Sequence, residues 1–249
     1  MKIICQIRRS KKYFETNTVS LPSNFTKTYA MYFNLRMVAW KLLFRMSYVE
    51  YRRRLAEIAF ETIKKNNFDD IFLYYDNKRI EKLDLGTLVI PVDEDDWFSP
   101  DLVKTLRSIE DTYEIIIWHA YHDNNLDRGK YKISTTHNFR IVSSCCYGLK
   151  TPFLEKKLRT HTNISKEGSY IIPNLLSFKL ANPGGISSLI YKNEVFSIES
   201  VKKRIMYHIS LNLNNDIIYP EEFKYGYSQY KDLLRDLIYS ARFDHGDMV

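Results

Sequence analysis

The chain has 249 residues, 45% of them hydrophobic, and carries a formal net charge of +7 with a pI of about 9.1. This length and composition are sufficient for one α/β domain with a complete core. Neither a GxGxxG nor a GxxxxGK[ST] motif occurs, and glycine is scarce, which argues against Rossmann-type dinucleotide binding and P-loop chemistry.

The cysteines and the apolar runs indicate in which cellular compartment the protein is expected. Cys5, Cys145 and Cys146 have neither zinc-site spacing nor the number needed for a disulfide framework, so we expect a reducing, cytoplasmic environment. The apolar run after Lys2 is much shorter than a signal peptide, and no run reaches the length of a membrane-spanning helix. The net positive charge favours polyanionic partners such as nucleotide phosphates, nucleic acid or anionic lipid headgroups.

The chain opens with an apolar, β-branched run that predicts a strand over residues 2–7. A basic cluster that includes Arg8 follows at once. This cluster can bind a phosphate group, although a solvated basic loop has the same composition.

Helical spacing of apolar residues predicts one long helix over residues 31–65. Arg52, Arg53 and Arg54 are expected on its outer face. Within it, the segment WKLLFRM at 40–46 mixes cations with aromatic and aliphatic residues, which is typical either of a helix on a membrane surface or of a core helix. A peripheral membrane contact is therefore one expectation.

Three further strands are predicted at 71–75, 88–92 and 113–118, with a short helix over 101–109. Asp76 follows the first of these strands. An acid at this place can bind a nucleotide base or ribose, and it can equally serve only as a turn residue. The other two runs are apolar without alternation, as strands covered on both faces should be.

The second half of the chain has weaker patterns. We expect strands over 131–134, 139–145 and 175–180, and helices over 151–160, 196–208 and 221–243. A glycine-containing turn at 182–185 is expected to approach the cleft, because glycine allows backbone to come close to a ligand.

The most informative stretch follows the strand predicted at 88–92, which ends in Asp93, Glu94, Asp95 and Asp96. Ligands bind at the carboxyl edge of open α/β sheets, where these acids are expected to lie. Adjacent carboxylates repel one another unless a cation lies among them, and hard oxygen ligands suit Mg²⁺ or Mn²⁺. The alternative is a solvated acidic turn that also caps the next helix.

The run VIPVDEDDWFSPDL, residues 89–102, resembles the LDxDDWxxPDxL pattern that carries the DXD motif of GT-A glycosyltransferases of the family 2 type. The order strand, helix, strand, strand, acids also resembles that family. The resemblance implies a single α/β domain with a central mixed, mostly parallel sheet flanked by helices. It also implies that Asp93 and Asp95, supported by Asp96, hold Mn²⁺ or Mg²⁺ that bridges the diphosphate of a nucleotide sugar.

Further site residues are expected around this motif. Arg8, Asp76 and Asp93 are expected to contact the nucleotide-sugar donor. An inverting enzyme needs a carboxylate base, for which Asp123 and Glu167 are the candidates. A third metal ligand, a His or an Asp, is expected downstream. His208, His161 and His137 are possible, and His208 is taken as the candidate.

In this interpretation, residues 1–125 form the nucleotide-sugar and metal half of one domain, and residues 126–249 form the acceptor half with C-terminal helices. The second half is basic and rich in aromatic residues, which suits a glycan, lipid-linked or protein acceptor; nucleic acid is not expected as a partner.

Two alternative functions stay open. The first is a two-metal phosphoryl-transfer enzyme, a nuclease or nucleotidyltransferase, and the second is a non-catalytic basic module that binds nucleic acid or membrane.

Overall fold

The structure is a computed structural model of the chain. It describes residues 1–9, 27–75, 83–122, 132–134, 144–151, 169–180, 182–183, 185, 197–214 and 221–242. Asp76, Asp123 and Glu167 therefore lie outside the described residues, as does most of the basic and aromatic region between 123 and 168.

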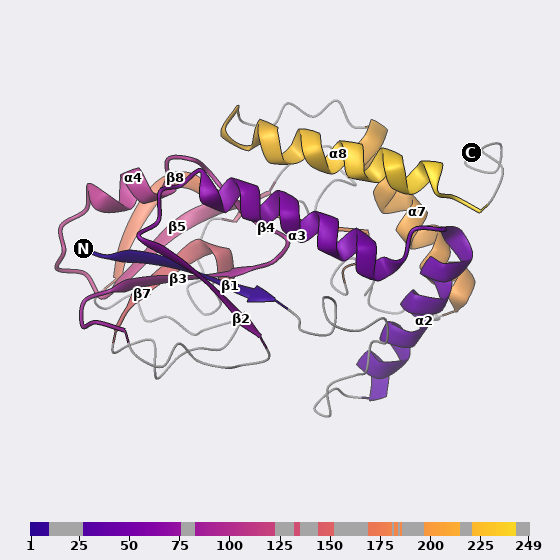
Figure 1. The fold of residues 1–249 in the computed structure, drawn as a ribbon, viewed down its shortest axis with the longest axis horizontal. Coiled ribbons are helices and arrows are strands. Elements are labelled where there is room, and N and C mark those ends of the chain that lie inside the picture. The colour runs from indigo at the N-terminus through magenta and orange to yellow at the C-terminus, as the bar shows by residue number, and fades with distance from the viewer. Residues whose placement is uncertain are drawn as a thin grey trace.

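The strands form one mixed sheet (Figure 1). Their bounds are β1 Ile3–Arg9, β2 Asp70–Tyr75, β3 Leu88–Asp93, β4 Asp96–Phe98, β5 Ile115–His122, β6 Lys132–Ser134, β7 Tyr147–Lys150 and β8 Ser169–Lys179. They lie in the order β2-β1-β3-β7-β5-β8-β4, and β6 pairs with β5 off this path. Strands β2, β1 and β3 are parallel, as are β5 and β8, whereas β7, β4 and β6 run antiparallel to their partners. The prediction of a mixed sheet is confirmed, but the sheet is not mostly parallel, because three of its strand pairings are parallel and four are antiparallel.

The direction of the strands determines which residues share an edge. Both β3 and β5 are antiparallel to β7, so the parallel strands β1, β2, β3, β5 and β8 all end at the same edge. In Figure 1, β1 and β2 point toward the side of the molecule that carries α2. The register places Arg8 of β1 directly opposite Asp93 of β3 at this edge.

The predicted central strands are buried, because they are apolar on both faces. Leu88, Val89 and Ile90 of β3 have no exposed surface, and Ile117 and Trp118 of β5 have none either. They belong to a core formed around the sheet.

The helix predicted over 31–65 is two helices, α2 (Lys27–Leu43) and α3 (Tyr48–Lys64). Ser47 caps the second helix, since its hydroxyl accepts a hydrogen bond from the Glu50 amide at 3.1 Å. The Trp40 indole donates to the Met46 carbonyl at 3.0 Å, and Phe44 pairs with Ala241 near the C-terminus. Two local contacts and one long-range contact thus accompany the break in a helix that periodicity alone would continue.

The segment 40–46 is divided between the core and the surface. Trp40, Leu43 and Phe44 are buried, whereas Leu42 is 52% exposed and Lys41 lies on the surface. None of the helices in the described part of the chain is long and apolar enough to cross a membrane.

Other boundaries also differ from the predictions. The helix expected over 101–109 is α4 (Leu102–Arg107), because the Ser99 amide donates to the Leu176 carbonyl and extends the sheet pairing past β4. Strand β8 begins earlier than expected, and Ser144–Cys146 forms a 3-10 turn, η2, followed by β7. The early start of β8 and strand β7 form because neighbouring strands supply hydrogen-bond partners. Short-range sequence patterns do not show these partners.

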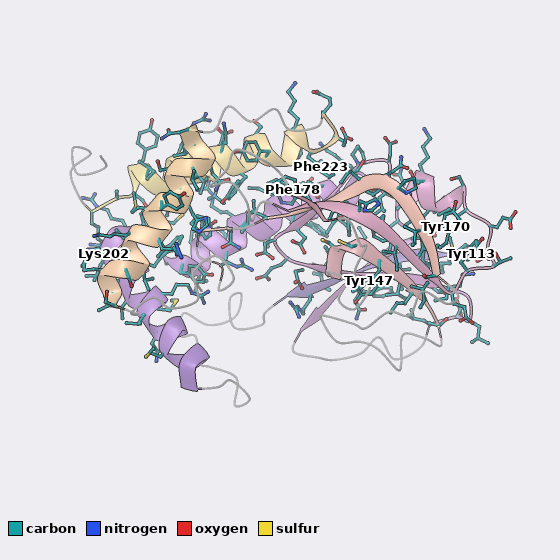
Figure 2. All side chains as sticks on the ribbon, turned by 180° about the vertical axis from the view of Figure 1, so that it is seen from behind. Tyr113, Tyr147, Tyr170, Phe178, Lys202 and Phe223 are labelled. Carbon is teal, nitrogen blue, oxygen red and sulfur yellow. The ribbon has the colours of Figure 1, made fainter. Side chains whose placement is uncertain are left out.

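The C-terminal helices pack with α2 and α3 into a second core. They are α7 (Ile198–Asn214) and α8 (Lys224–Tyr239), the latter preceded by a 3-10 turn, η3, at Glu221–Phe223. Trp97 of β4 and Phe178 of β8 belong to this core, with stacked rings 5.0 Å apart. Figure 2 shows Phe178 beside Phe223 where the sheet meets these helices, whereas Tyr113 and Tyr170 lie together at the other end of the sheet.

Candidate functional site

The four consecutive acids lie where β3 passes into β4. Asp93 is the last residue of β3, Glu94 and Asp95 form a turn, and Asp96 begins β4. Glu94 and Asp96 are 4% and 2% exposed, whereas the side chains of Asp93 and Asp95 are 22% and 20% exposed. Two carboxylates of the run thus face solvent, and two are buried.

A buried arginine joins two of these acids. Arg52, on the second turn of α3, donates from Nη2 to Glu94 Oε1 at 2.6 Å and from Nη1 to Asp95 Oδ2 at 2.9 Å. Its side chain is only 10% exposed. The planar guanidinium group can hold two carboxylates at once, which a lysine ammonium group cannot do with fixed geometry.

A second arginine holds the first acid. Arg8 Nη2 lies 2.6 Å from Asp93 Oδ1, as the pairing of β1 with β3 requires. The Arg8 side chain is 38% exposed, so this guanidinium group faces solvent and that of Arg52 does not. Phosphate binding by Arg8 stays a prediction, whereas the position of Arg8 beside the acids is observed.

The turn after β8 also reaches the acids. Asn182, which is 2% exposed, donates from Nδ2 to Asp95 Oδ2 at 2.7 Å. The Gly185 amide donates to the Asn182 carbonyl at 2.9 Å and closes the turn. The 182–185 turn, which was predicted to approach the cleft, thus contacts the acid run at Asn182.

Electrostatics explain why the arginines are needed. Two like charges 4 Å apart repel by about 4 kcal/mol in the dielectric typical of a protein surface. The sequence predicted that a cation must lie among Asp93, Glu94 and Asp95, and guanidinium groups fill that role in this structure. Arg8 and Arg52 therefore offset part of the negative charge of the acid run from within the chain itself.

A divalent cation fits this site only when a ligand supplies part of its coordination. Among the described residues, no three His, Cys, Asp or Glu side chains converge to hold a metal ion. Asp93 and Asp95 each bind a guanidinium group through one carboxylate oxygen. Mg²⁺ commonly binds through one or two carboxylates together with phosphate oxygens and water, so two carboxylates alone would not complete its coordination.

His208 is not brought into a ligand set with Asp93 and Asp95 among the described residues. It lies on α7, is 8% exposed, and has its ring edge-on to Tyr207 with the centroids 5.9 Å apart. Because α7 packs against α2 and α8, the histidine lies within the helical layer.

Tyr51, the neighbour of Arg52, is not a candidate base, because burial raises its pKa and the phenol stays protonated.

Sequence reasoning missed Arg52, which it placed on an outer helix face with Arg53 and Arg54. Both of those side chains form exposed ion pairs, Arg53 with Glu50 and Arg54 with Asp236. Arg52, in contrast, is spaced from Leu55 and Ala59 so that it lies on the same buried face of the helix. This spacing is the sequence signal that could have identified Arg52 as a buried residue.

The chain matches no protein-family model, and no similar curated protein or solved structure was found.

Proposed function

We propose that this protein is a metal-dependent glycosyltransferase of the GT-A type that moves a sugar from a nucleotide-sugar donor to a glycan, lipid-linked or protein acceptor. The observation that carries the proposal is the position of the acids. Asp93 and Asp95 lie partly exposed at the edge of the mixed sheet where its parallel strands end, which is where open α/β folds bind ligands. The order β1, helices, β2, β3, acids agrees with the resemblance of residues 89–102 to the GT-A motif.

The residues at this edge suit a nucleoside diphosphate. A bound Mn²⁺ or Mg²⁺ offsets the negative charge that develops on the departing diphosphate. Asp93 and Asp95 would hold the ion, and Arg8 presents an exposed guanidinium group beside them that can pair with a phosphate oxygen. Asp96 is buried at the start of β4 and supports the turn in this proposal.

The proposal is tested by ligand-dependent stabilisation. Thermal unfolding is measured with UDP-, GDP-, CMP- and dTDP-sugars, each with and without Mn²⁺, and with single-stranded DNA and RNA in parallel. We expect one nucleotide sugar to raise the unfolding temperature only when Mn²⁺ is present. A ligand at one hundred times its Kd contributes about 2.7 kcal/mol of stability. Stabilisation by DNA or RNA alone would favour a nucleic-acid enzyme or binding module instead.

The first prediction concerns Asp95→Asn. The amide is a poorer cation ligand, so Mn²⁺-dependent stabilisation by the nucleotide sugar should disappear and its turnover should fall about a hundredfold or more. The unfolding free energy should change by only about 1 kcal/mol, because losing the Arg52 ion pair offsets the relief of carboxylate repulsion.

Asp101→Asn is the matched control, since Asp101 lies in the same segment, is exposed and makes no side-chain hydrogen bond to the start of α4. It should behave as the wild type in both measurements. Retention of full Mn²⁺-dependent turnover by Asp95→Asn would refute the assignment.

A further inference from the structure

The outward face of α2 carries a row of apolar side chains. Met31, Val38 and Leu42 are 46%, 45% and 52% exposed. At 3.6 residues per turn, their spacing along the helix places the three side chains within an arc of about 40°. Single exposed apolar residues are common on protein surfaces, but three on one face of a helix form a continuous stripe.

The opposite face of the same helix is already covered. Ala39, Trp40 and Leu43 are buried in the core that α2 forms with α3, α7 and α8. The exposed stripe is therefore not needed to attach α2 to the rest of the protein. In Figure 1, α2 projects from the other helices at the end of the molecule away from α4.

Cations accompany this stripe, and acids do not. Lys41 lies in the last turn of α2 and Arg45 follows the helix, and both are exposed. Arg242 is held at the same end of the helix, since its amide donates to the Leu43 carbonyl at 2.9 Å and its Nε to the Phe44 carbonyl at 3.1 Å. Within the described ranges, none of these three cations forms an ion pair with an acid. The sequence from 27 to 46 contains no Asp or Glu.

This combination matches the surface of an anionic lipid bilayer. A helix that lies in the plane of a bilayer buries its apolar face about 5–10 Å into the boundary between headgroups and acyl chains. Cations beside that face are attracted to anionic headgroups. An apolar anchor alone binds weakly and reversibly, whereas an apolar anchor together with a basic patch binds more stably.

Two other partners fit this face less well. A second copy of the chain would bring the same cations together across a two-fold axis, and like charges facing each other at an interface are unfavourable. A nucleic acid would pair with the cations but would leave the apolar stripe in water.

We propose that the outward face of α2, with Lys41, Arg45 and Arg242 at its C-terminal end, binds the surface of an anionic lipid bilayer. Binding through this face does not require the proposed reaction, because it uses none of the residues at the edge of the sheet. The sugar-transfer assay and the membrane assay therefore succeed or fail independently.

The test measures binding of the full chain to lipid vesicles by flotation. Vesicles of phosphatidylcholine alone are compared with vesicles of phosphatidylcholine and phosphatidylserine in equal amounts. The wild type should float with the anionic vesicles only. Added sodium chloride should weaken this binding, because salt screens the attraction between the cations and the headgroups.

Two double variants remove the two parts of the surface separately, and all four positions are exposed. Lys41→Gln with Arg45→Gln should weaken binding to the anionic vesicles about 25-fold, since each cation near such a surface contributes about fivefold. Val38→Gln with Leu42→Gln should weaken it about tenfold or more, because both aliphatic side chains are lost from the contact. If one double variant fails to unfold cooperatively, the other decides.

The matched control combines Leu85→Gln with Lys104→Gln. Leu85 is 86% exposed and precedes β3, and Lys104 is an exposed residue of α4, away from α2 in Figure 1. This variant loses the same kinds of side chain from another part of the surface, so it should bind vesicles as the wild type does.

Several results would overturn the proposal. They are absence of binding to the anionic vesicles, equal binding to the neutral ones, and unchanged binding of both α2 variants. Sedimentation without lipid and retention of labelled single-stranded RNA are measured in parallel. A dimer that the α2 variants dissociate would assign this face to a second copy. Retention of RNA that only the cation variant loses would assign it to nucleic acid.

Discussion

Gly148 lies in β7 at the point where this strand passes closest to the side chain of Leu88 on β3. A Cβ atom at position 148 would lie 3.0 Å from both Cγ and Cδ1 of Leu88, which has no exposed surface. An additional methyl group in such a packed core forces side chains away from their preferred rotamers. The missing side chain therefore allows β7 to lie between β3 and β5 in the sheet that presents the acids.

Gly148→Ala should accordingly lower the free energy of unfolding by about 1–3 kcal/mol, measured by chemical denaturation at pH 7. Leu88→Val removes one methylene at the same contact, so the double variant should be less destabilised than the sum of the two single variants. Strict additivity would show that the two side chains do not share this space.

At the scale of elements, Asp69 fastens the start of β1 to α4. Its Oδ2 accepts a hydrogen bond from the Ile3 amide at 2.7 Å, and its Oδ1 pairs with Arg107 Nη2 at 2.9 Å. The Ile3 hydrogen bond is the main cause that holds the pKa of Asp69 below its ordinary value, with Arg107 adding to it. Because β1 carries Arg8 at its other end, this contact also helps to fix the strand that reaches the site.

The sign of the pH effect follows from that lowered pKa. A carboxyl group whose pKa is lower in the folded state contributes stability above its unfolded pKa, about 3.9 for Asp, and loses it as pH falls through the folded value. Asp69→Asn should therefore cost about 1 kcal/mol at pH 7, and the difference from wild type should narrow below about pH 4. Denaturation curves at pH 7 and pH 3 measure this, and an equal difference at both values would contradict it.

At the scale of the whole molecule, the core around the sheet buries every cysteine. Cys5 and Cys145 have no exposed surface, and Cys146 is 1% exposed. Burial raises the pKa of the Cys5 thiol, which keeps it in the unreactive protonated form. The rate at which the thiols react therefore indicates whether the core that contains them is accessible to solvent.

The native protein should react slowly with a disulfide reagent such as DTNB at pH 8, at a rate set by opening of the core. All three thiols of the sequence should react at once in guanidinium chloride. Rapid labelling of one thiol in the native protein would show that this part of the core is more open than the structure describes.

The sequence by itself determined the types of the main elements and the position of the acids. Strands β1, β2, β3 and β5 were predicted because continuous apolar runs leave no other way to bury both faces. Asp93 at the end of β3 followed from the same pattern, since the change from apolar to acidic residues marks the end of the strand. These features depend on short-range order along the chain.

Only the tertiary structure decided which groups meet at the site. Arg52 is 43 residues from Asp95, and Asn182 is 87 residues from it, so no local pattern connects them. At the break between α2 and α3, Ser47 supplies a local cap, whereas the contact of Phe44 with Ala241 depends on tertiary packing. An ion pair or a long-range contact of this kind forms only when distant segments pack together, because burial removes the water that would otherwise solvate each charge or backbone group.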